Sequence, residues 1–360
     1  MIENQRLHGM DALRGIAMWL GVVLHSSISY RTNHTRGSWP MDGDSSALMD
    51  LIYMYLHSFR MQMFFLVAGF FAHFLAQRIG LRKFIKHRFK RIVLPLLVSL
   101  VTIIPLTSSG FQFDPSGDSS MIDLFFNSIK WTGFYHLWFL YYLILFYVLF
   151  IIASSLSVGL KLQSIPELVV FLSIPVLWAI HHFYFDGPVE AWTGIKPQLG
   201  QILYYGFFFM LGVIIYSQPS FLFRYKRLRY TYLLLGFALF GLEAFQRFHN
   251  INLVGESILL SSTTVFFVFG HVSLFMHFFK KESKNLRYFS DSSYWYYLIH
   301  LPLVVWMQLL LMNFAINIWL KFSLIILITT TISLISYRYF VRYTFIGILL
   351  NGRKKKKVSE

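Results

Sequence analysis

The sequence predicts an all-α membrane protein that crosses the bilayer about ten times. The first reason is composition: 56% of the 360 residues are hydrophobic, 19% are aromatic and only 13% are charged, which is too apolar for a soluble domain. The second reason is that the hydrophobic residues gather in runs of about membrane-spanning length. The third is that the basic residues fall in short blocks between these runs.

The apolar runs follow one another along the whole chain. They cover residues 10–30, 51–77, 92–107, 136–158, 168–183, 199–216, 230–245, 257–279, 293–312 and 320–340. Several runs are short and contain Pro or Gly. The alternative for one of these short runs is a re-entrant segment. The first run carries three ionisable residues and has no small-residue cleavage site, so we expect it to be retained as a helix.

The basic blocks predict the orientation. With a cytoplasmic N-terminus, 22 of the 32 Lys and Arg residues lie on the inner side and five on the outer side. Because cytoplasmic loops carry the excess of Lys and Arg, both termini are expected in the cytoplasm. We therefore assign the net charge of +16 to topology and not to nucleic-acid binding. We expect one integral-membrane domain over residues 1–350 and a basic cytoplasmic tail over 351–360 that lies near membrane lipids.

Some kinds of chemistry are excluded or not indicated. The chain has no cysteine, which excludes disulfides, thiolate nucleophiles and thiolate metal sites. Its 13 histidines lack metal-ligand spacing, so no metal is expected. The sequence also has no Walker loop, no Gly-x-Ser-x-Gly elbow and no dinucleotide fingerprint.

Arg14 and His25 stand out within the first apolar run, because an ionisable side chain inside a membrane is costly and usually functional. Eleven residues return a helix to nearly the same face, so the two side chains lie in line, roughly 16 Å apart along the axis. Asp11 joins the same face. This stripe indicates a polar path through the bilayer. In the alternative interpretation, Arg14 only pairs with Asp11 and His25 is a hydrogen-bonded core histidine, but His25 lies beyond the bilayer centre.

Five blocks of the sequence resemble integral-membrane acyltransferase family 3. MDALRGIAMWLGVVLH, which ends at His25, contains the family's pattern of an Arg, ten residues and a His. The other blocks, in order, are HSFRMQMFFLVAGFFAHFL from His57, KHRFKRIVLPLL ending at Leu97, HLWFLYYLILF from His136 and SSYWYYLIHLPLV from Ser292. Within the family, the HSFRMQ and HLWFL blocks and GESILLSSTTVFFVFGH from Gly255 most resemble its glucan-succinylating members.

The resemblance implies an enzyme of the bacterial inner (cell) membrane. It would move an acyl group, succinyl in the glucan branch, from cytoplasmic acyl-CoA to a hydroxyl of an extracytoplasmic glucan. Succinyl-CoA or acetyl-CoA would be a donor substrate, and no cofactor would be permanently bound. His25 would act as general base or as a transient acyl carrier. Arg14 would position the donor, and Asp11 would orient Arg14.

Arg88 and Arg91 match the family's Arg-x-x-Arg motif at the cytoplasmic end of the third segment. At a spacing of three residues they share a helix face, where two guanidiniums can clamp the phosphates of coenzyme A. The alternative is that they serve topology alone.

Further residues are predicted to line a substrate pocket near His25. They are His57, Arg60, His136, Trp138, Glu243 and His300. For Arg60 the alternative is outward snorkelling, and for the single histidines it is core packing. Glu243, placed deep in its segment, needs a basic partner that the sequence does not identify. The outer aromatics Trp39, Tyr184 and Trp192 favour an interfacial belt over a sugar-stacking surface.

Two rival functions remain at this point. A proton-coupled transporter would also place charged residues along a membrane path, although no inverted repeat is evident. The other rival is an O-acetyltransferase of a lipid-linked or surface polysaccharide.

Overall fold

The computed structural model describes residues 8–32, 39–113, 133–156, 169–217, 227–281 and 283–352, together with residues 123, 124 and 126. In these ranges the chain forms helices joined by loops, and no strand occurs. The predicted all-helical character is therefore confirmed for the described part of the chain.

Most helices overlap the apolar runs, whereas α3 (Leu81–Arg88) lies in a basic stretch and α15 (Phe345–Asn351) lies beyond the last run. In chain order they are α1 (His8–Ile28), α2 (Ala47–Ile79), α3 (Leu81–Arg88), the π-helix η1 (Phe89–Val93), α4 (Leu94–Val101), α5 (Ile103–Gln112), the 3-10 helix η2 (Tyr135–Leu137), α7 (Trp138–Ser155), α8 (Val169–Tyr184), α9 (Leu199–Ser217), α11 (Arg229–His249), α12 (Glu256–Phe278), α13 (Lys284–Leu311), α14 (Ile318–Ser336), the π-helix η4 (Tyr337–Val341) and α15 (Phe345–Asn351).

Six of these helical stretches are long and apolar enough to cross a membrane. They are α2, η2 with α7, α9, α12, α13, and α14 with η4. The stretch from α3 to α5 makes a seventh span if its two parts, which meet at a bend of 40°, are taken together. Helix α8 has only 16 residues, and α1 and α11 carry charged side chains. The structure therefore describes a multi-pass membrane protein, and the number of ten spans stays a prediction.

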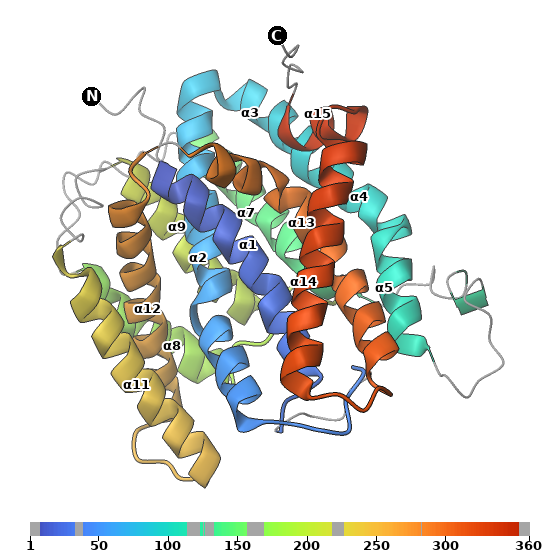
Figure 1. The fold of residues 1–360 in the computed structure, drawn as a ribbon. Coiled ribbons are helices and arrows are strands. Elements are labelled where there is room, and N and C mark those ends of the chain that lie inside the picture. Colours follow the sequence, from blue (N-terminus) through green and yellow to red (C-terminus); the bar gives the residue numbers. More distant parts are fainter. Residues whose placement is uncertain are drawn as a thin grey trace.

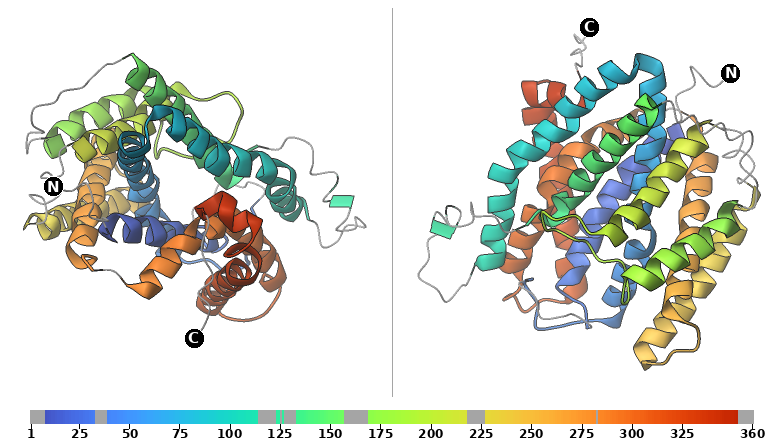
Figure 2. Two further views of the ribbon diagram at one scale, coloured as in Figure 1. Left: turned by 90° about the horizontal axis from the view of Figure 1, so that it is seen from above. Right: turned by 180° about the vertical axis from the view of Figure 1, so that it is seen from behind.

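The helices pack around α1 and α2 (Figure 1). On one side of this pair lie α8, α9, α11 and α12, and on the other lie α4, α5, α13 and α14 (Figure 2). Helix α1 begins at the end of the bundle where α3 and α15 lie, whereas the α1–α2 and α11–α12 loops lie at the opposite end. We call these the first end and the second end of the bundle.

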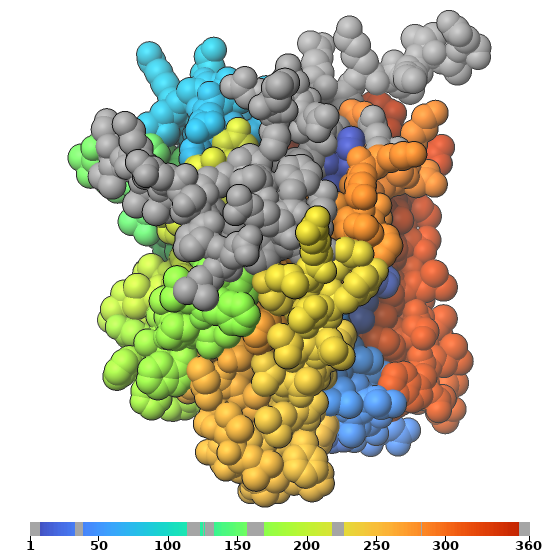
Figure 3. Space-filling model, turned by 90° about the vertical axis from the view of Figure 1, so that its left-hand side faces the viewer, coloured from blue at the N-terminus to red at the C-terminus, as the bar shows by residue number. Residues whose placement is uncertain are grey.

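Helices α2 and α9 approach each other closely, which fixes the helix that carries His57 and Arg60. A Cβ atom at Gly69 would collide with the carbonyl of Phe209, and one at Gly212 would collide with the carbonyl of Leu66. Small residues allow this backbone approach between helices in a membrane. The outward surface carries exposed apolar side chains instead: Phe183 of α8 is 76% exposed and Leu234 of α11 is 71% exposed. Both helices lie on the face shown in Figure 3. Such a surface is suited to lipid.

The orientation can be tested by reporter fusions. A reporter fused after Glu360 is expected to be active when it needs the cytoplasm and silent when it needs the periplasm, because the basic blocks predict that both ends of the chain lie inside. A reporter inserted at Asp44, in the α1–α2 loop, should give the opposite pattern. Periplasmic activity after Glu360 would contradict this topology and would place Arg88 and Arg91 away from cytoplasmic coenzyme A.

Candidate active site

Three cavities adjoin one another between the central helices. The arginine cavity, of about 220 Å³, is lined by Arg14, Arg88 and Arg91 among others. The histidine chamber, of about 390 Å³, is lined by His25, His57, Arg60, His136, Trp138 and His300 among others. The acidic cavity, of about 590 Å³, is lined by Asp50, Glu190, Glu243 and Glu256 among others.

Shared lining residues place the cavities in a row. Met18, Phe64 and Phe139 line both the arginine cavity and the histidine chamber. Four residues line both the chamber and the acidic cavity: Arg31, Tyr53, His57 and Glu190. The walls of the first two cavities come mainly from α1, α2, α7 and α13. The row leads from the first end of the bundle, past the shared apolar side chains and the chamber lined by His25, to the second end.

Arg14 lies in the arginine cavity, where neighbours on two helices hold it. Its Nη2 donates a hydrogen bond to Ser290 Oγ at 3.2 Å and lies 3.6 Å from the Asp11 carboxylate. Ser290 Oγ in turn donates to the Asp11 carbonyl at 3.0 Å. Asp11 itself does not line the arginine cavity, but faces a small neighbouring hollow. Its position fits a residue that orients Arg14.

Arg88 and Arg91 line the same cavity, although Arg88 ends α3 and Arg91 lies in the π-helix η1. The Leu94 N–H bonds to the Phe89 carbonyl, one residue further back than in an α-helix. Pro95 accounts for this widening, because its ring would collide with the carbonyl four residues earlier, that of Arg91. The Arg88 guanidinium lies over two aromatic rings, at 5.2 Å from the Phe84 centroid and 4.9 Å from that of Tyr147.

The net charge of the arginine cavity is positive. His87 lines it beside the three arginines, and Asp291 is the acidic residue among the described lining residues. Such a cavity attracts phosphate groups.

The His25 ring lies between two other rings in the histidine chamber. The Trp39 ring stacks on it with centroids 5.8 Å apart, and the His300 ring lies at 5.4 Å. Within the described residues, His25 Nδ1 has no hydrogen-bond partner. The imidazole is therefore held by packing, and its Nδ1 is left for a ligand.

His300 and His136 are oriented by backbone carbonyls. His300 Nδ1 lies 2.7 Å from the Tyr297 carbonyl, and His136 Nε2 lies 3.1 Å from the Leu298 carbonyl. Because a carbonyl oxygen only accepts, these nitrogens carry the hydrogens, and the other ring nitrogen of each neutral histidine is an acceptor. Among the described residues neither of these acceptors has a partner. Both histidine rings line the chamber and are not only packed in the core.

Trp39 departs from its predicted place in an interfacial belt. Its Nε1 donates to Gln308 Oε1 at 3.1 Å, and Gln308 Nε2 donates to the His25 carbonyl at 3.1 Å. One glutamine thus connects the loop after α1 to the backbone of the helix turn that carries His25. The neighbouring loop residue Asp42 forms a buried ion pair with Lys321 of α14, at 2.6 Å. These long-range contacts, which helix periodicity does not encode, bring Trp39 into the chamber.

Arg60 points into the chamber and does not snorkel to the surface. Its guanidinium lies against α1 at Gly21, where a Cβ atom would collide with Arg60 Nη1. In the described part of the chain no carboxylate lies within 4.0 Å of Arg60, and its buried Nε has no hydrogen-bond partner. Three tyrosines lie nearby, Tyr53, Tyr205 and Tyr297, together with the chamber histidines. Arg60 is thus a cation that has no counter-ion among the described residues, and it lies beside the histidines.

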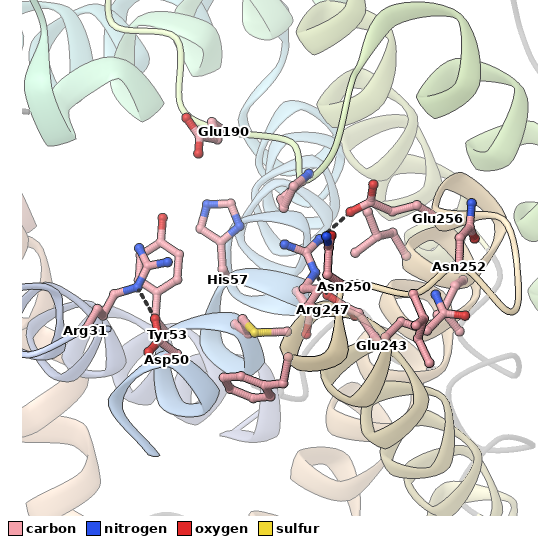
Figure 4. A pocket seen from close by; sticks show the side chains of 18 residues that line it. Arg31, Asp50, Tyr53, His57, Glu190, Glu243, Arg247, Asn250, Asn252 and Glu256 are labelled. Carbon is pink, nitrogen blue, oxygen red and sulfur yellow. Dashed lines mark hydrogen bonds and ion pairs between the residues drawn. The ribbon is translucent and has the colours of Figure 1, made fainter. Parts of the chain in front are cut away.

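The acidic cavity contains two ion-pair groups, with His57 between them (Figure 4). Arg31 lies 3.1 Å from the buried Asp50 carboxylate, and its guanidinium covers the Tyr53 ring at 3.9 Å. Arg247 lies 2.7 Å from the Glu256 carboxylate. The His57 ring stacks on that of Tyr53 with centroids 5.2 Å apart.

Glu243 is the one predicted pocket residue that lies outside the histidine chamber. Its partner, which the sequence left open, is Arg247, with Nε and Oε1 3.3 Å apart. It lies in the last two turns of α11, is buried as expected and lines the acidic cavity. The spacing of four residues on one helix is a signal that was available in the sequence.

Glu190 reaches the boundary between chamber and acidic cavity on the loop that joins α8 to α9. The Gln201 side chain holds this loop: its Nε2 donates to the Glu190 carbonyl at 2.5 Å, and its Oε1 accepts from the Trp192 N–H at 3.3 Å. Trp192 Nε1 donates to the Lys196 carbonyl at 2.7 Å. Nothing in the local sequence marked Glu190, because its place depends on these bonds to neighbouring elements.

The acyltransferase domain family matches residues 7–338, which include every predicted site residue. The chain belongs to acyltransferase family 3. The resemblance noted in the sequence blocks is thereby confirmed, and this acyltransferase is an enzyme, as expected. It is 25% identical over 383 residues to glucans biosynthesis protein C of Escherichia coli strain K12, covering 98% of this chain and 96% of the relative. The protein of that name from Shigella dysenteriae serotype 1 has the same identity, 25%, and the same coverage, 98% and 96%. No solved structure matches this acyltransferase significantly.

Proposed function

We propose that this acyltransferase moves an acyl group from cytoplasmic acyl-CoA to a hydroxyl of an extracytoplasmic glucan. The observation that carries the proposal is the row of three cavities, which joins an arginine-lined entrance at the first end to an acidic cavity at the second end and passes His25 between them. An enzyme that acylates across a membrane needs such a passage, because the charged donor head cannot cross the bilayer.

The donor occupies the arginine cavity and the passage. The phosphates of coenzyme A dock on Arg88 and Arg91, with Arg14 beside them, through charge-assisted hydrogen bonds. The uncharged pantetheine arm extends along Met18, Phe64 and Phe139 and brings the thioester carbonyl into the histidine chamber. Because the pantetheine arm fills the space between the helices, water is excluded from the thioester.

The transfer takes place in the histidine chamber. His25 removes the proton of the acceptor hydroxyl while its oxygen attacks the thioester carbonyl carbon. Arg60 stabilises the negative charge that develops on the carbonyl oxygen. The carbon–sulfur bond then breaks, and the thiolate of coenzyme A takes up the proton from His25. The role of Arg60 is favoured because no carboxylate of the described residues pairs with it.

The glucan acceptor is supported by similarity to glucans biosynthesis protein C over 98% of the chain. For the acyl group we propose succinyl, with acetyl as the alternative. Mass spectrometry of cell glycans from a deletion strain tests both. A missing succinyl mass on glucans is the expected result. A missing acetyl mass would show that the transferred group is acetyl. Unchanged glycans would favour the alternative function as a transporter.

Arg88→Ala and Arg91→Ala are expected to weaken acyl-CoA binding about tenfold or more, because each removes a charge-assisted contact worth roughly 1.5 to 3 kcal/mol. The rate at saturating donor should change less, since these contacts are remote from the thioester. Isothermal titration of the purified protein with acyl-CoA measures the effect.

Lys90→Ala is the matched control for these variants. Lys90 lies between the two arginines in sequence but is exposed and does not line the arginine cavity. If all three variants lose affinity equally, the effect is one of general surface charge and the proposed phosphate clamp is wrong.

A further inference from the structure

The acidic cavity is the largest of the three cavities, and the donor scheme makes no use of it. It opens at the second end of the bundle and shares four lining residues with the histidine chamber. A molecule bound here would adjoin the histidine chamber, which His25 lines. The chemistry of this cavity therefore indicates what the acceptor is.

Acidic and amide side chains dominate the lining. Four carboxylates line it against two guanidiniums, and Gln246, Asn250 and Asn252 add three amides. The guanidiniums are occupied, because Arg31 pairs with Asp50 and Arg247 bridges Glu243 and Glu256. Their positive charge is thus already balanced by protein carboxylates.

Two carboxylates retain unused acceptor capacity. Glu243 is only 4% exposed, and within the described residues its buried Oε2 has no hydrogen-bond partner. The Glu190 side chain has no bond to another described residue in this structure and stands at the entrance to the histidine chamber. A buried carboxylate oxygen without a donor is unfavourable. A ligand rich in hydroxyl groups supplies the missing donors.

The charge of the cavity selects against anionic acceptors. A phosphate or carboxylate brought beside Glu190 and Glu243 would be repelled, and no free guanidinium of the described lining would compensate it. A hydroxyl donates to a carboxylate without any charge penalty. This distinguishes a neutral saccharide from a lipid-linked pyrophosphate acceptor.

The wall of the cavity is rigid before any ligand binds. Gln246 Oε1 accepts from the backbone N–H groups of Leu253 and Val254, at 2.9 and 2.7 Å, and its Nε2 donates to the Val254 carbonyl at 3.1 Å. These bonds fix the loop between α11 and α12 against the end of α11. His57 is likewise fixed by its stacking on Tyr53. Preorganised groups lose little entropy when a saccharide binds.

We infer that the acidic cavity is the acceptor site, and that it binds a neutral saccharide through hydrogen bonds from sugar hydroxyls to Glu190 and Glu243. This inference rests on the proposed acyl transfer. The hydroxyl to be acylated extends past His57 into the histidine chamber and meets the thioester beside His25. Phosphorylated acceptors are rejected by the same two carboxylates.

The test compares two acceptors in steady-state assays with purified full-length protein and acyl-CoA. One is a neutral glucose oligosaccharide, and the other is the same oligosaccharide carrying one phosphate. Glu243→Gln and Glu190→Gln are each expected to raise KM for the neutral acceptor about tenfold, with KM for acyl-CoA unchanged. Asp44→Asn is the control, because it removes the same charge from an exposed loop residue at the same end and lies outside all three cavities.

The outcomes separate the two proposals. If both glutamate variants acylate the neutral acceptor with an unchanged KM for that acceptor, the proposed acceptor site is wrong. The proposed acyl transfer would not be affected by this result. Preference of the wild type for the phosphorylated acceptor would lead to the same conclusions. Failure of the wild type to acylate either saccharide, while it still binds acyl-CoA, would overturn the proposed function itself. A rise in acyl-CoA KM equal to that for the saccharide would show a general structural defect and would also overturn the specific role.

Discussion

Replacement of His25 by Ala is expected to slow acyl transfer by about a hundredfold to ten-thousandfold while acyl-CoA still binds. His25 lines the chamber that adjoins both other cavities, and its Nδ1 has no partner in the described structure. It is therefore available to accept a proton from the attacking hydroxyl. The donor contacts that we propose for Arg88 and Arg91 lie in a different cavity, so donor affinity should persist.

Initial rates at saturating acyl-CoA and saccharide measure this effect, and titration with acyl-CoA establishes that the variant is folded. Wild-type activity should fall as the pH is lowered, because a protonated imidazole cannot accept the proton. His182→Ala is a suitable control, since His182 is an exposed histidine of α8 outside the three cavities. Near wild-type transfer by His25→Ala would refute this mechanism, and His300, whose Nε2 is unpartnered in the described structure, would become the next candidate base.

Arg60→Met is expected to reduce the rate of transfer by roughly a hundredfold to a thousandfold, the usual cost of removing a group that stabilises an oxyanion. Arg60→Lys should retain part of the activity because it keeps the positive charge. Stability should not fall in Arg60→Met, since no ion pair of Arg60 with a described residue is lost. A cation kept without a counter-ion in the interior is costly to the fold and so points to a role in catalysis.

Lys321→Met supplies the contrasting case for stability. Loss of the Lys321 ammonium leaves the buried Asp42 carboxylate without its ion-pair partner. This is expected to lower the free energy of unfolding by about 3 to 5 kcal/mol. Thermal denaturation in detergent compares the two variants, and turnover at saturating substrates compares their chemistry. If Arg60→Met lowers the melting temperature as much as Lys321→Met and leaves turnover intact, Arg60 is structural and the proposed oxyanion contact is wrong.

Residues on the helices were the part of the site that the sequence could predict. His25, His57, Arg60, His136 and His300 all line one chamber, and Arg14, Arg88 and Arg91 all line another cavity. An ionisable residue inside an apolar run is conspicuous whatever its neighbours are, because its cost depends on the membrane and not on the fold. Helix periodicity then places Arg14 and His25 on one face, a property of a single segment.

The loop residues of the site were missed for the opposite reason. Trp39 reaches His25 only because Gln308, far along the chain on α13, binds its indole, and Glu190 reaches the chamber only because Gln201 holds its loop. Arg31 was interpreted as a topological charge, but Asp50 and Tyr53 turn it into the cavity wall. Such contacts join segments that are far apart in sequence, so no local pattern carries them.

The sequence by itself determined the helical class, the positions of the helices and the family, because hydrophobicity, helix period and motif order are properties of consecutive residues. Only the tertiary structure decided that the ionisable residues divide among an arginine cavity, a histidine chamber and an acidic cavity, and that Arg60 has no counter-ion in the described residues. Packing between α1, α2, α7 and α13 makes that division. The shape and charge of an enclosed space depend on which side chains face each other across it.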